Sequence, residues 1–341
     1  MKRTSMADTD TSWIDLTTEE PIDPDIAICD PHHHFWDRPG NRYMLDELLS
    51  DIAGGHNITE TVFVECSAMY RKDGPANMRP VGEIEFVQGL AAQSASGGYG
   101  ETKIAAGIVG FADLSLGDNV IEVLEAQIDA SRNRFRGIRN SSCWDQSPEI
   151  TGYKNPPEGL LKDKNFRQGF SHLRRLDLSF DAWMYHTQLQ ELFDLAKSYP
   201  DTPIILDHIG GPIGIGPYSG KQVEVVKLWS EGISNLSKCE NVVVKLGGLG
   251  MPLGGFKWHE RNAPPSSKDI AKIMSPYYEH CIEEFGVNRC MFESNFPVDN
   301  VSTSYTVLWN AFKRITRDYS KNERSSLFRD TALQVYRIAA N

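Results

Sequence analysis

Short apolar runs alternate with longer amphipathic segments along most of the chain, from about residue 26 onward. Runs rich in Val, Ile, Leu and Phe that stop after a few residues are typical of buried strands. They predict strands at 26–30, 61–66, 104–110, 135–139, 178–184, 203–207, 242–246 and 290–294. Apolar residues at helical spacing predict helices at 82–93, 119–131, 188–199, 222–238, 267–285, 304–317 and 322–339.

This alternation predicts an α/β protein with a parallel sheet, because most of the strands are followed by a helix long enough to return the chain. Eight such units are the number that closes a (β/α)8 TIM barrel. An open, doubly wound sheet is the alternative, although no Gly-x-Gly-x-x-Gly follows the first strand. Residues 1–24 are polar, acidic and proline-containing, and we expect a flexible arm there. Residues 25–341 are then one barrel domain.

The composition and charge of the chain limit which partners and which cellular locations are expected. The net charge of −11 argues against nucleic acid, which binds to basic surfaces. No apolar stretch approaches the roughly 18 residues of a membrane helix, and the basic start lacks the apolar core of a secretory signal. The six cysteines lack metal-type spacing, so we expect a reduced, cytoplasmic protein.

The candidate chemistry lies at the ends of the predicted strands. His32 and His34 follow the first apolar run, and alternate residues of an extended chain share a face. Two imidazoles on one face suit a metal, or a paired acid and base. His186, His208 and the segment 294–299 also lie at or just after strand ends. In a barrel these ends form the active-site face.

These motifs resemble the amidohydrolase superfamily, in the branch of sugar-acid lactonases, 2-pyrone-4,6-dicarboxylate lactonase and 4-sulfomuconolactonase, in which a metal is optional. The resemblance extends from about residue 26 to the C-terminus. The matching segments are 30–37, 106–114, 135–139, 206–212, 244–249 and 291–297.

The resemblance implies a metal site at His32, His34 and His208, which correspond to the family's strand-one and strand-six histidines. It would hold one divalent ion, zinc or manganese, and a metal-free site is the alternative. His186 falls where some members have a strand-five ligand, and we expect it to be catalytic, although it could instead cap the following helix.

The resemblance fails at the family's strand-eight base. The usual Ser-Asp-Trp-Pro motif carries an aspartate that acts as the general base, and here Asn295 stands in its place. Asp299, four residues on, is the nearest carboxylate, and we predict that it is the catalytic base. Its alternative role is to cap a helix that begins near Ser302.

Four further residues are candidates for substrate binding. Arg139 is nearest the end of its strand and would hold a substrate carboxylate, or form an internal salt bridge to Glu65. Lys245, at the end of the seventh strand, has the same two interpretations. Trp36 and Tyr70 could wall a pocket for a ring-shaped ligand or simply pack.

We therefore expect a hydrolase that opens a lactone, or a related cyclic ester, of a small carboxylated or polyhydroxylated substrate. The histidines would polarise the carbonyl while Asp299 takes a proton from water. The second hypothesis is a metal-dependent decarboxylase of an aromatic or enoic acid. A third is a non-catalytic ligand-binding barrel, suggested by Asn295. The expected partner is a small anionic molecule, and a homodimer would be ordinary for a barrel.

Overall fold

The structure is a computed structural model, described over residues 11–152 and 154–339. Eight parallel strands form one sheet in the order β1-β4-β5-β6-β7-β8-β9-β10, which follows the order of the chain. Their bounds are β1 Ile28–His33, β4 Ile58–Val64, β5 Lys103–Gly110, β6 Phe135–Arg139, β7 Ser179–Ala182, β8 Ile204–Leu206, β9 Val242–Leu246 and β10 Cys290–Phe292. The predicted α/β class is confirmed.

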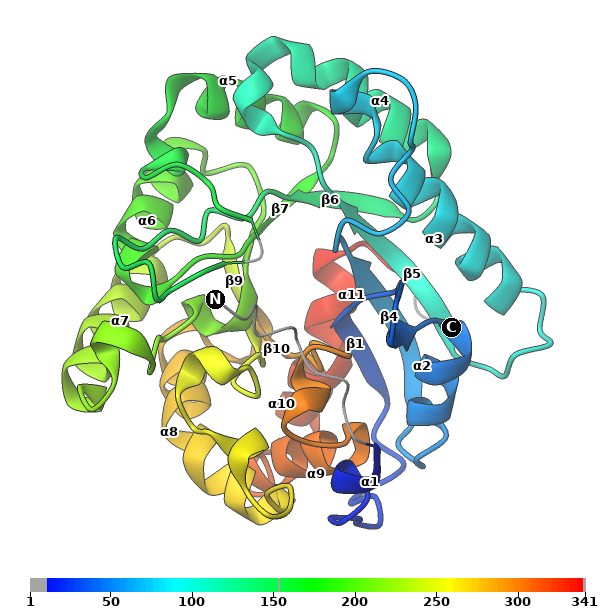
Figure 1. Cartoon of the computed structure of the whole chain (residues 1–341), viewed down its shortest axis with the longest axis vertical. Coiled ribbons are helices and arrows are strands. Elements are labelled where there is room, and N and C mark those ends of the chain that lie inside the picture. The colour runs from blue at the N-terminus through cyan, green and yellow to red at the C-terminus, as the bar shows by residue number, and fades with distance from the viewer. Residues whose placement is uncertain (1–10, 153, 340–341) are drawn as a thin grey trace.

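The sheet curves into a barrel that the segment after β10 closes. The amide of Asn295 donates to the carbonyl of His32 (2.9 Å), and the amide of His34 donates to the carbonyl of Phe296 (2.8 Å). Helices surround the strands (Figure 1). They are α2 Leu45–Ile52, α3 Val81–Ser94, α4 Val120–Ala130, α5 Lys164–Arg175, α6 Leu189–Ser198, α7 Gln222–Leu236, α8 Ser267–Phe285, α9 Tyr305–Ile315, α10 Lys321–Ser325 and α11 Thr331–Val335. This is the predicted (β/α)8 barrel.

The sequence pattern did not predict three elements. A short hairpin, β2 (Trp36–Arg38) and β3 (Asn41–Tyr43), follows β1, and α2 comes directly after it. Helix α5 was also missed, although the Asp163 carboxylate caps it by accepting from the amide of Phe166 (2.8 Å). The two hairpin strands and α2 are short, so few apolar repeats fall within them, whereas α5 has 12 residues and its pattern was not recognised.

Residues 11–24 belong to the segment expected to be a flexible arm, whose residues 1–10 lie outside the described part of the chain. The described part begins with α1 (Thr11–Ile14). It contacts the region before α8, since Trp13 donates to the carbonyl of Arg261 (2.9 Å) and Thr17 to that of Pro264 (2.7 Å).

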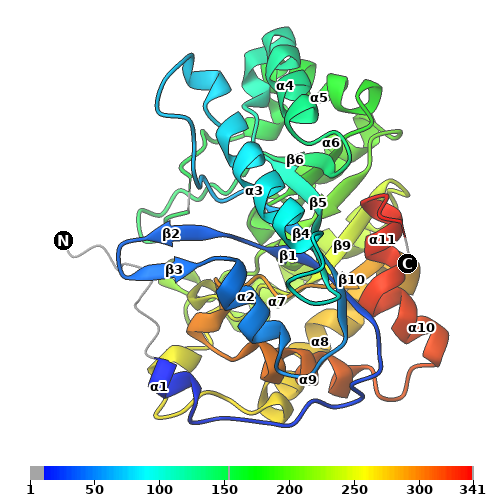
Figure 2. The same ribbon diagram turned by 90° about the vertical axis from the view of Figure 1, so that its right-hand side faces the viewer.

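The two ends of the barrel carry different segments. Figure 2 shows the β2–β3 hairpin on one side of the strands and α10 and α11 on the other. The hairpin follows the carboxyl end of β1, so it marks the end where barrels carry active sites. No helix among the described residues combines the length and apolar character needed to cross a membrane.

Candidate active site

A cavity of about 320 Å³ opens at the carboxyl ends of the strands. Such a volume is at the small end of the range for ligand pockets, which suits a single-ring substrate. Among the described residues that line it there is no Asp or Glu. Its polar and aromatic lining includes His34, Trp36, Arg38, Arg139, His208 and Asn295.

His208 lies in the cavity wall and is held from behind by Glu293. Its Nδ1 lies 2.6 Å from Glu293 Oε1, and the same oxygen accepts the backbone amide of His208 (3.1 Å). An ionised carboxylate can only accept, so Nδ1 carries the proton and Nε2 is the basic atom. This is the arrangement of a histidine that moves protons at Nε2.

The chain is strained where it presents this histidine. His208 (φ 54°) and Ile209 (φ 50°) both have left-handed backbone conformations, which are rare for residues with a side chain and uncommon above all for β-branched ones. Gly248 leaves the space that the turn needs, because a Cβ there would lie 2.5 Å from His208 Cβ. Strain of this kind persists where the surrounding structure fixes a functional geometry.

A fully buried charge cluster lies beneath the cavity. His32 Nδ1 lies 2.8 Å from Glu293 Oε2, so Glu293 bridges His32 and His208. Lys245 Nζ contacts Asp207 (2.9 Å) and Asp181 (2.8 Å) and lies 3.2 Å from His32 Nδ1. Ion pairs at such depth need nearly complete pairing to offset their desolvation.

The pairing keeps most of the cluster ionised. Burial opposes ionisation of Glu293, but His208 and His32 outweigh it and hold its pKa at about 2. Burial likewise opposes ionisation of Asp207, yet Lys245 and His32 hold its pKa well below the usual value. Despite burial, the pKa of Lys245 is raised by Asp181 and Asp207. Asp181 differs, because burial dominates and raises its pKa to about 6.

Arg139 joins the cavity to the buried cluster. Its Nε donates to Glu65 Oε1 (3.1 Å), Nη2 donates to the backbone carbonyl of Glu65, and Nη1 lies 3.4 Å from Asp207 Oδ2. Nη1 also lies 3.2 Å from His32 Nε2. The salt bridge to Glu65 is the alternative considered from the sequence, and it is present while Arg139 still lines the cavity.

Asn295 lines the cavity, and Asp299 lies behind it. Asn295 Nδ2 donates to Asp299 Oδ1 (2.8 Å), and the amide of Gly250 donates to Asp299 Oδ2 (2.9 Å). Burial raises the pKa of Asp299 to about 7, although His208 and these donors oppose the shift. Asp299 therefore fixes the side chain of Asn295, and its role as general base stays a prediction that this geometry does not favour.

The structure brings together part of the predicted site. His208, His34, Arg139 and Trp36 line the cavity. The rings of His32 and His34 lie 4.9 Å apart, in keeping with the shared face expected for them. His34 Nδ1 donates to the carbonyl of Val64 (2.7 Å), and burial lowers the pKa of His34 well below its usual value, so its ring is neutral.

Five predicted residues do not line the cavity: His32 and Asp299, which lie behind its wall, and three others. His186 Nδ1 accepts from the amide of Ile213 (3.4 Å), and its ring packs against Tyr218. Tyr70 lies beside Ser67, with the two hydroxyl oxygens 3.4 Å apart. Lys245 is completely buried in the charge cluster. Their predicted contacts with reactants stay untested.

Three residues that line or support the cavity were not predicted to act there. Glu293 lies within a motif noted for its resemblance, but no role was assigned to it. Arg38 belongs to the unpredicted hairpin; it donates to the carbonyl of Cys66 (3.1 Å) and covers the Trp36 ring. Asp207 was not among the candidates, because strand alternation places its side chain opposite that of His208.

Two of the three predicted metal ligands, His32 and His208, form a possible metal site together with Asp207. The donor atoms of these three residues lie within 4.8 Å of one another. These are ligand types that zinc accepts. His34 is not part of this group. However, Lys245 and Arg139 already contact both oxygens of Asp207 and both ring nitrogens of His32. These three residues could hold one divalent ion, which would have to displace Lys245 and Arg139 from the same donors.

Comparison with known proteins gives a consistent result. The sequence profile of the family described as Amidohydrolase matches residues 29–338. Uncharacterized protein y4mH of Sinorhizobium fredii is 35% identical over 329 residues, which are 92% of this chain and 99% of that protein. An L-fucono-1,5-lactonase of Burkholderia ambifaria is 24% identical over 324 residues, 91% of this chain and 95% of that enzyme.

Solved structures share the fold. An amidohydrolase of Burkholderia multivorans crystallised with HEPES superposes with a TM-score of 0.71 at 20% identity, over 92% of this chain and 100% of that one. A second crystal form of the same protein, with bound zinc, gives 0.70 at 21% identity over the same shares. At this identity the likeness establishes the barrel, and the chemistry must be argued from the residues.

Proposed function

Because the chain belongs to the amidohydrolase family, whose profile covers residues 29–338, we propose that it is a hydrolase that opens a lactone ring by attack of water. The observation that carries the proposal is the His208–Glu293 pair in the wall of a small cavity. A carboxylate-oriented imidazole facing a ring-sized pocket is suited to general acid–base catalysis. The similar L-fucono-1,5-lactonase supports the same reaction class.

His208 supplies the proton transfers in this mechanism. Its Nε2 accepts a proton from water as the water oxygen bonds to the lactone carbonyl carbon. Glu293, 2.6 Å from Nδ1, stabilises the imidazolium that forms. As the tetrahedral intermediate collapses, the ring C–O bond breaks and Nε2 returns the proton to the leaving alkoxide oxygen. The product is the open hydroxy acid.

Arg139 and Asn295 stabilise the oxyanion that develops on the carbonyl oxygen. Both line the cavity, and both are fixed by carboxylates, Glu65 for Arg139 and Asp299 for Asn295. Donors held in place before the reaction stabilise developing charge without having to reorient. Asp299 acts through Asn295 in this mechanism and is a positioning residue.

The cavity favours a substrate that carries a carboxylate or several hydroxyls. Arg38 and Arg139 line it, and no carboxylate pairs with Arg38 among the described residues. A guanidinium can bind a carboxylate through two parallel hydrogen bonds. The neutral His34 offers Nε2 as an acceptor for a hydroxyl, since its Nδ1 donates to Val64. Trp36 and Trp183 provide flat apolar walls for a ring.

A panel of sugar-acid and dicarboxylate lactones, assayed by proton release in a weakly buffered solution, tests the proposal. One proton per ring opened is expected, because the acid product ionises. We also expect turnover to survive dialysis against a chelator, since Lys245 and Arg139 already contact the candidate metal donors. No turnover on the whole panel, or carbon dioxide as the product, would refute lactone hydrolysis. Loss of turnover on chelation, restored by zinc, would refute only the metal-free mechanism.

We also propose a cellular compartment and an oligomeric state for the protein. All six cysteines are buried and free, which supports a reducing compartment such as the cytoplasm. A homodimer stays a prediction, to be measured by analytical ultracentrifugation.

A further inference from the structure

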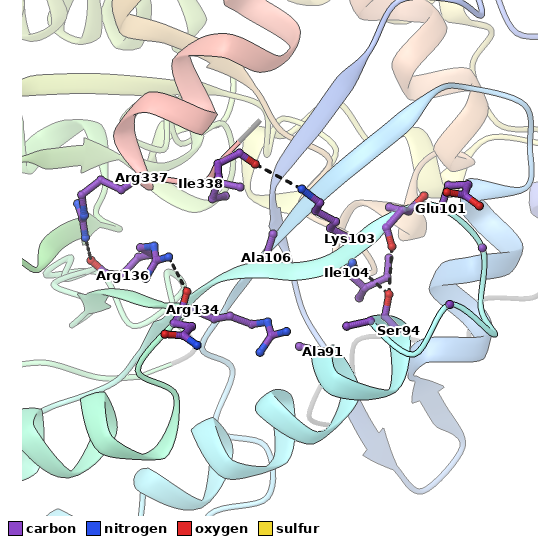
Figure 3. A pocket seen from close by; sticks show the side chains of 16 residues that line it. Ala91, Ser94, Glu101, Lys103, Ile104, Ala106, Arg134, Arg136, Arg337 and Ile338 are labelled. Atoms are coloured by element: carbon purple, nitrogen blue, oxygen red, sulfur yellow. Dashed lines mark hydrogen bonds between the residues drawn. The ribbon is translucent and has the colours of Figure 1, made fainter. Parts of the chain in front are cut away.

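A second and larger cavity, of about 630 Å³, lies at the opposite end of the barrel. It is formed where β5 and β6 begin, together with the chain that follows α11 (Figure 3). Lys103 is the first residue of β5, whereas Arg139, in the candidate active site, is the last residue of β6. The two cavities therefore lie at opposite ends of the strands.

Four cationic side chains line this second cavity, against a single acid among the described residues. The cations are Lys103, Arg134, Arg136 and Arg337, and the acid is Glu101. Figure 3 shows Arg337 beside Arg136, with the Arg134 side chain extending from there toward Ala91 and Glu101 at the opposite side. In a protein whose net charge is −11, such a local excess of positive charge is unusual and would attract small anions.

Neutral oxygens, rather than carboxylates, accept most of the hydrogen bonds of these cations. Arg136 donates to the carbonyls of Phe135 (3.0 Å) and Asn133 (2.6 Å). Arg134 donates to Gln88 Oε1 (3.1 Å), and Lys103 lies 3.4 Å from the Ala339 carbonyl. These contacts orient the side chains but leave their charge uncompensated.

Among the residues that the structure describes, Arg337 is the one member of this group that forms a salt bridge, and it also contacts Arg136. Its Nε lies 3.3 Å from Asp177 Oδ2, while Nη2 donates to the carbonyls of Arg136 (2.9 Å) and Asp177 (2.8 Å). Arg337 (φ 51°) and Asp177 (φ 56°) both have left-handed backbone conformations. The chain is thus held in strained conformations beside the arginines, a cost that is usual at binding sites.

Arg136 has remaining capacity to bind a ligand. Its Nε is buried and has no hydrogen-bond partner among the described residues. A buried donor without a partner costs free energy, which a shift of this side chain toward a bound anion would recover. Burial lowers the pKa of Arg136, and repulsion from the guanidinium groups of Arg337 and Arg134 lowers it further, although Asp177 opposes this shift.

We propose that this cavity binds a small organic anion that carries at least two phosphate or carboxylate groups. The arginines would bind the anionic groups, for which their planar donors are suited. Ile104, Ala106 and Ile338 provide an apolar surface for the body of the molecule. The site is separate from the catalytic cavity and does not depend on the proposed reaction.

Isothermal titration of the full chain at low ionic strength, with inorganic pyrophosphate and separately with citrate, tests this proposal. Saturable binding of either anion is expected, and the anion that binds more tightly identifies phosphate or carboxylate as the preferred group. Arg134→Gln and Arg136→Gln should each weaken binding by roughly tenfold to a hundredfold, as expected for the loss of a charge-assisted hydrogen bond.

Matched controls separate this site from other positive charge. Arg132→Gln changes a nearby arginine that is 73% exposed and pairs with Asp129, so it should leave the affinity unchanged. Arg38→Met alters the catalytic cavity and should also leave it unchanged. Circular dichroism checks the folding of each variant, and Arg134→Gln provides the test if Arg136→Gln fails to fold. The proposal is overturned if neither anion binds, if Arg134→Gln binds like the parent, or if Arg38→Met abolishes binding.

Discussion

Replacing Glu293 by glutamine tests the proposed mechanism most directly. The carboxylate bridges His208 Nδ1 (2.6 Å) and His32 Nδ1 (2.8 Å), and all three side chains are almost fully buried. Two opposite unit charges about 4 Å apart attract by about 4 kcal/mol at an effective dielectric constant of 20. If that attraction stabilises the imidazolium in the transition state, its loss should lower kcat by about a thousandfold.

The amide would also disturb the proton arrangement. Glutamine offers one acceptor oxygen for two Nδ1–H donors, so one histidine must face an N–H group and take the other tautomer. KM should change little, because Glu293 does not line the cavity. Steady-state kinetics by proton release on the best lactone of the panel would measure both parameters.

Glu83→Gln is the matched control for this substitution. Glu83 is also fully buried and accepts backbone amides, from Cys66 (3.0 Å) and Ala68 (2.7 Å), but it does not contact an imidazole. Burial raises its pKa to about 8, so it is largely neutral at pH 7 and the amide changes little charge. A folded Glu293→Gln protein that keeps kcat close to the parent value would refute the role of His208 as a carboxylate-supported base.

Three further predictions concern the surroundings of the site. Lys245→Met leaves Asp181 without its buried cation and Asp207 with Arg139 alone, and it should lower the free energy of unfolding by about 3–5 kcal/mol, measured by urea denaturation. An unchanged midpoint would contradict the buried ion pairs. For Asp299, burial raises the folded-state pKa from 3.8 to about 7, so the native state keeps a proton that the unfolded chain releases. The contribution of Asp299 to the free energy of unfolding therefore falls as pH rises from about 4 to 7. Between pH 5 and pH 8, the Asp299→Asn protein should lose less stability than the parent protein, as measured by urea titrations of both. An identical pH dependence in the two proteins would contradict this. Arg38→Met should raise KM for a carboxylated lactone by roughly tenfold to a hundredfold and leave KM for an uncharged lactone unchanged. An equal effect on both substrates would show that Arg38 does not recognise the substrate carboxylate.

The barrel was predictable because its strands are short apolar runs with recognisable ends. The predicted ranges 135–139 and 242–246 coincide with β6 and β9, and 267–285 coincides with α8. Helix α8 also has the expected start signal, since Ser266 and Asp269 form a reciprocal cap. The β2–β3 hairpin has no comparable signal, because each of its strands is only three residues long.

The site was less predictable because strand alternation stops where the strand stops. β8 ends at Leu206, and the left-handed turn at His208 and Ile209 then changes the direction of the side chains. Asp207 and His208 consequently both lie near His32, although alternation places them on opposite faces. The supporting role of Glu293 depends on contacts between segments that are distant in sequence, which a single sequence does not reveal.

The buried charge cluster around Lys245 also limits how this protein can be improved. Well-packed apolar replacements of buried ion pairs are often neutral or stabilising, so the chain gives up some thermal resistance to keep these groups. In return, the charged groups around His208 are already oriented before the reaction begins. Little energy is therefore needed to reorient them at each turnover. Selection for a higher Tm alone would therefore favour variants that remove the cluster, and such variants should be more stable and less active. Engineering for durability should accordingly leave this part of the barrel unchanged and stabilise the outer helices instead.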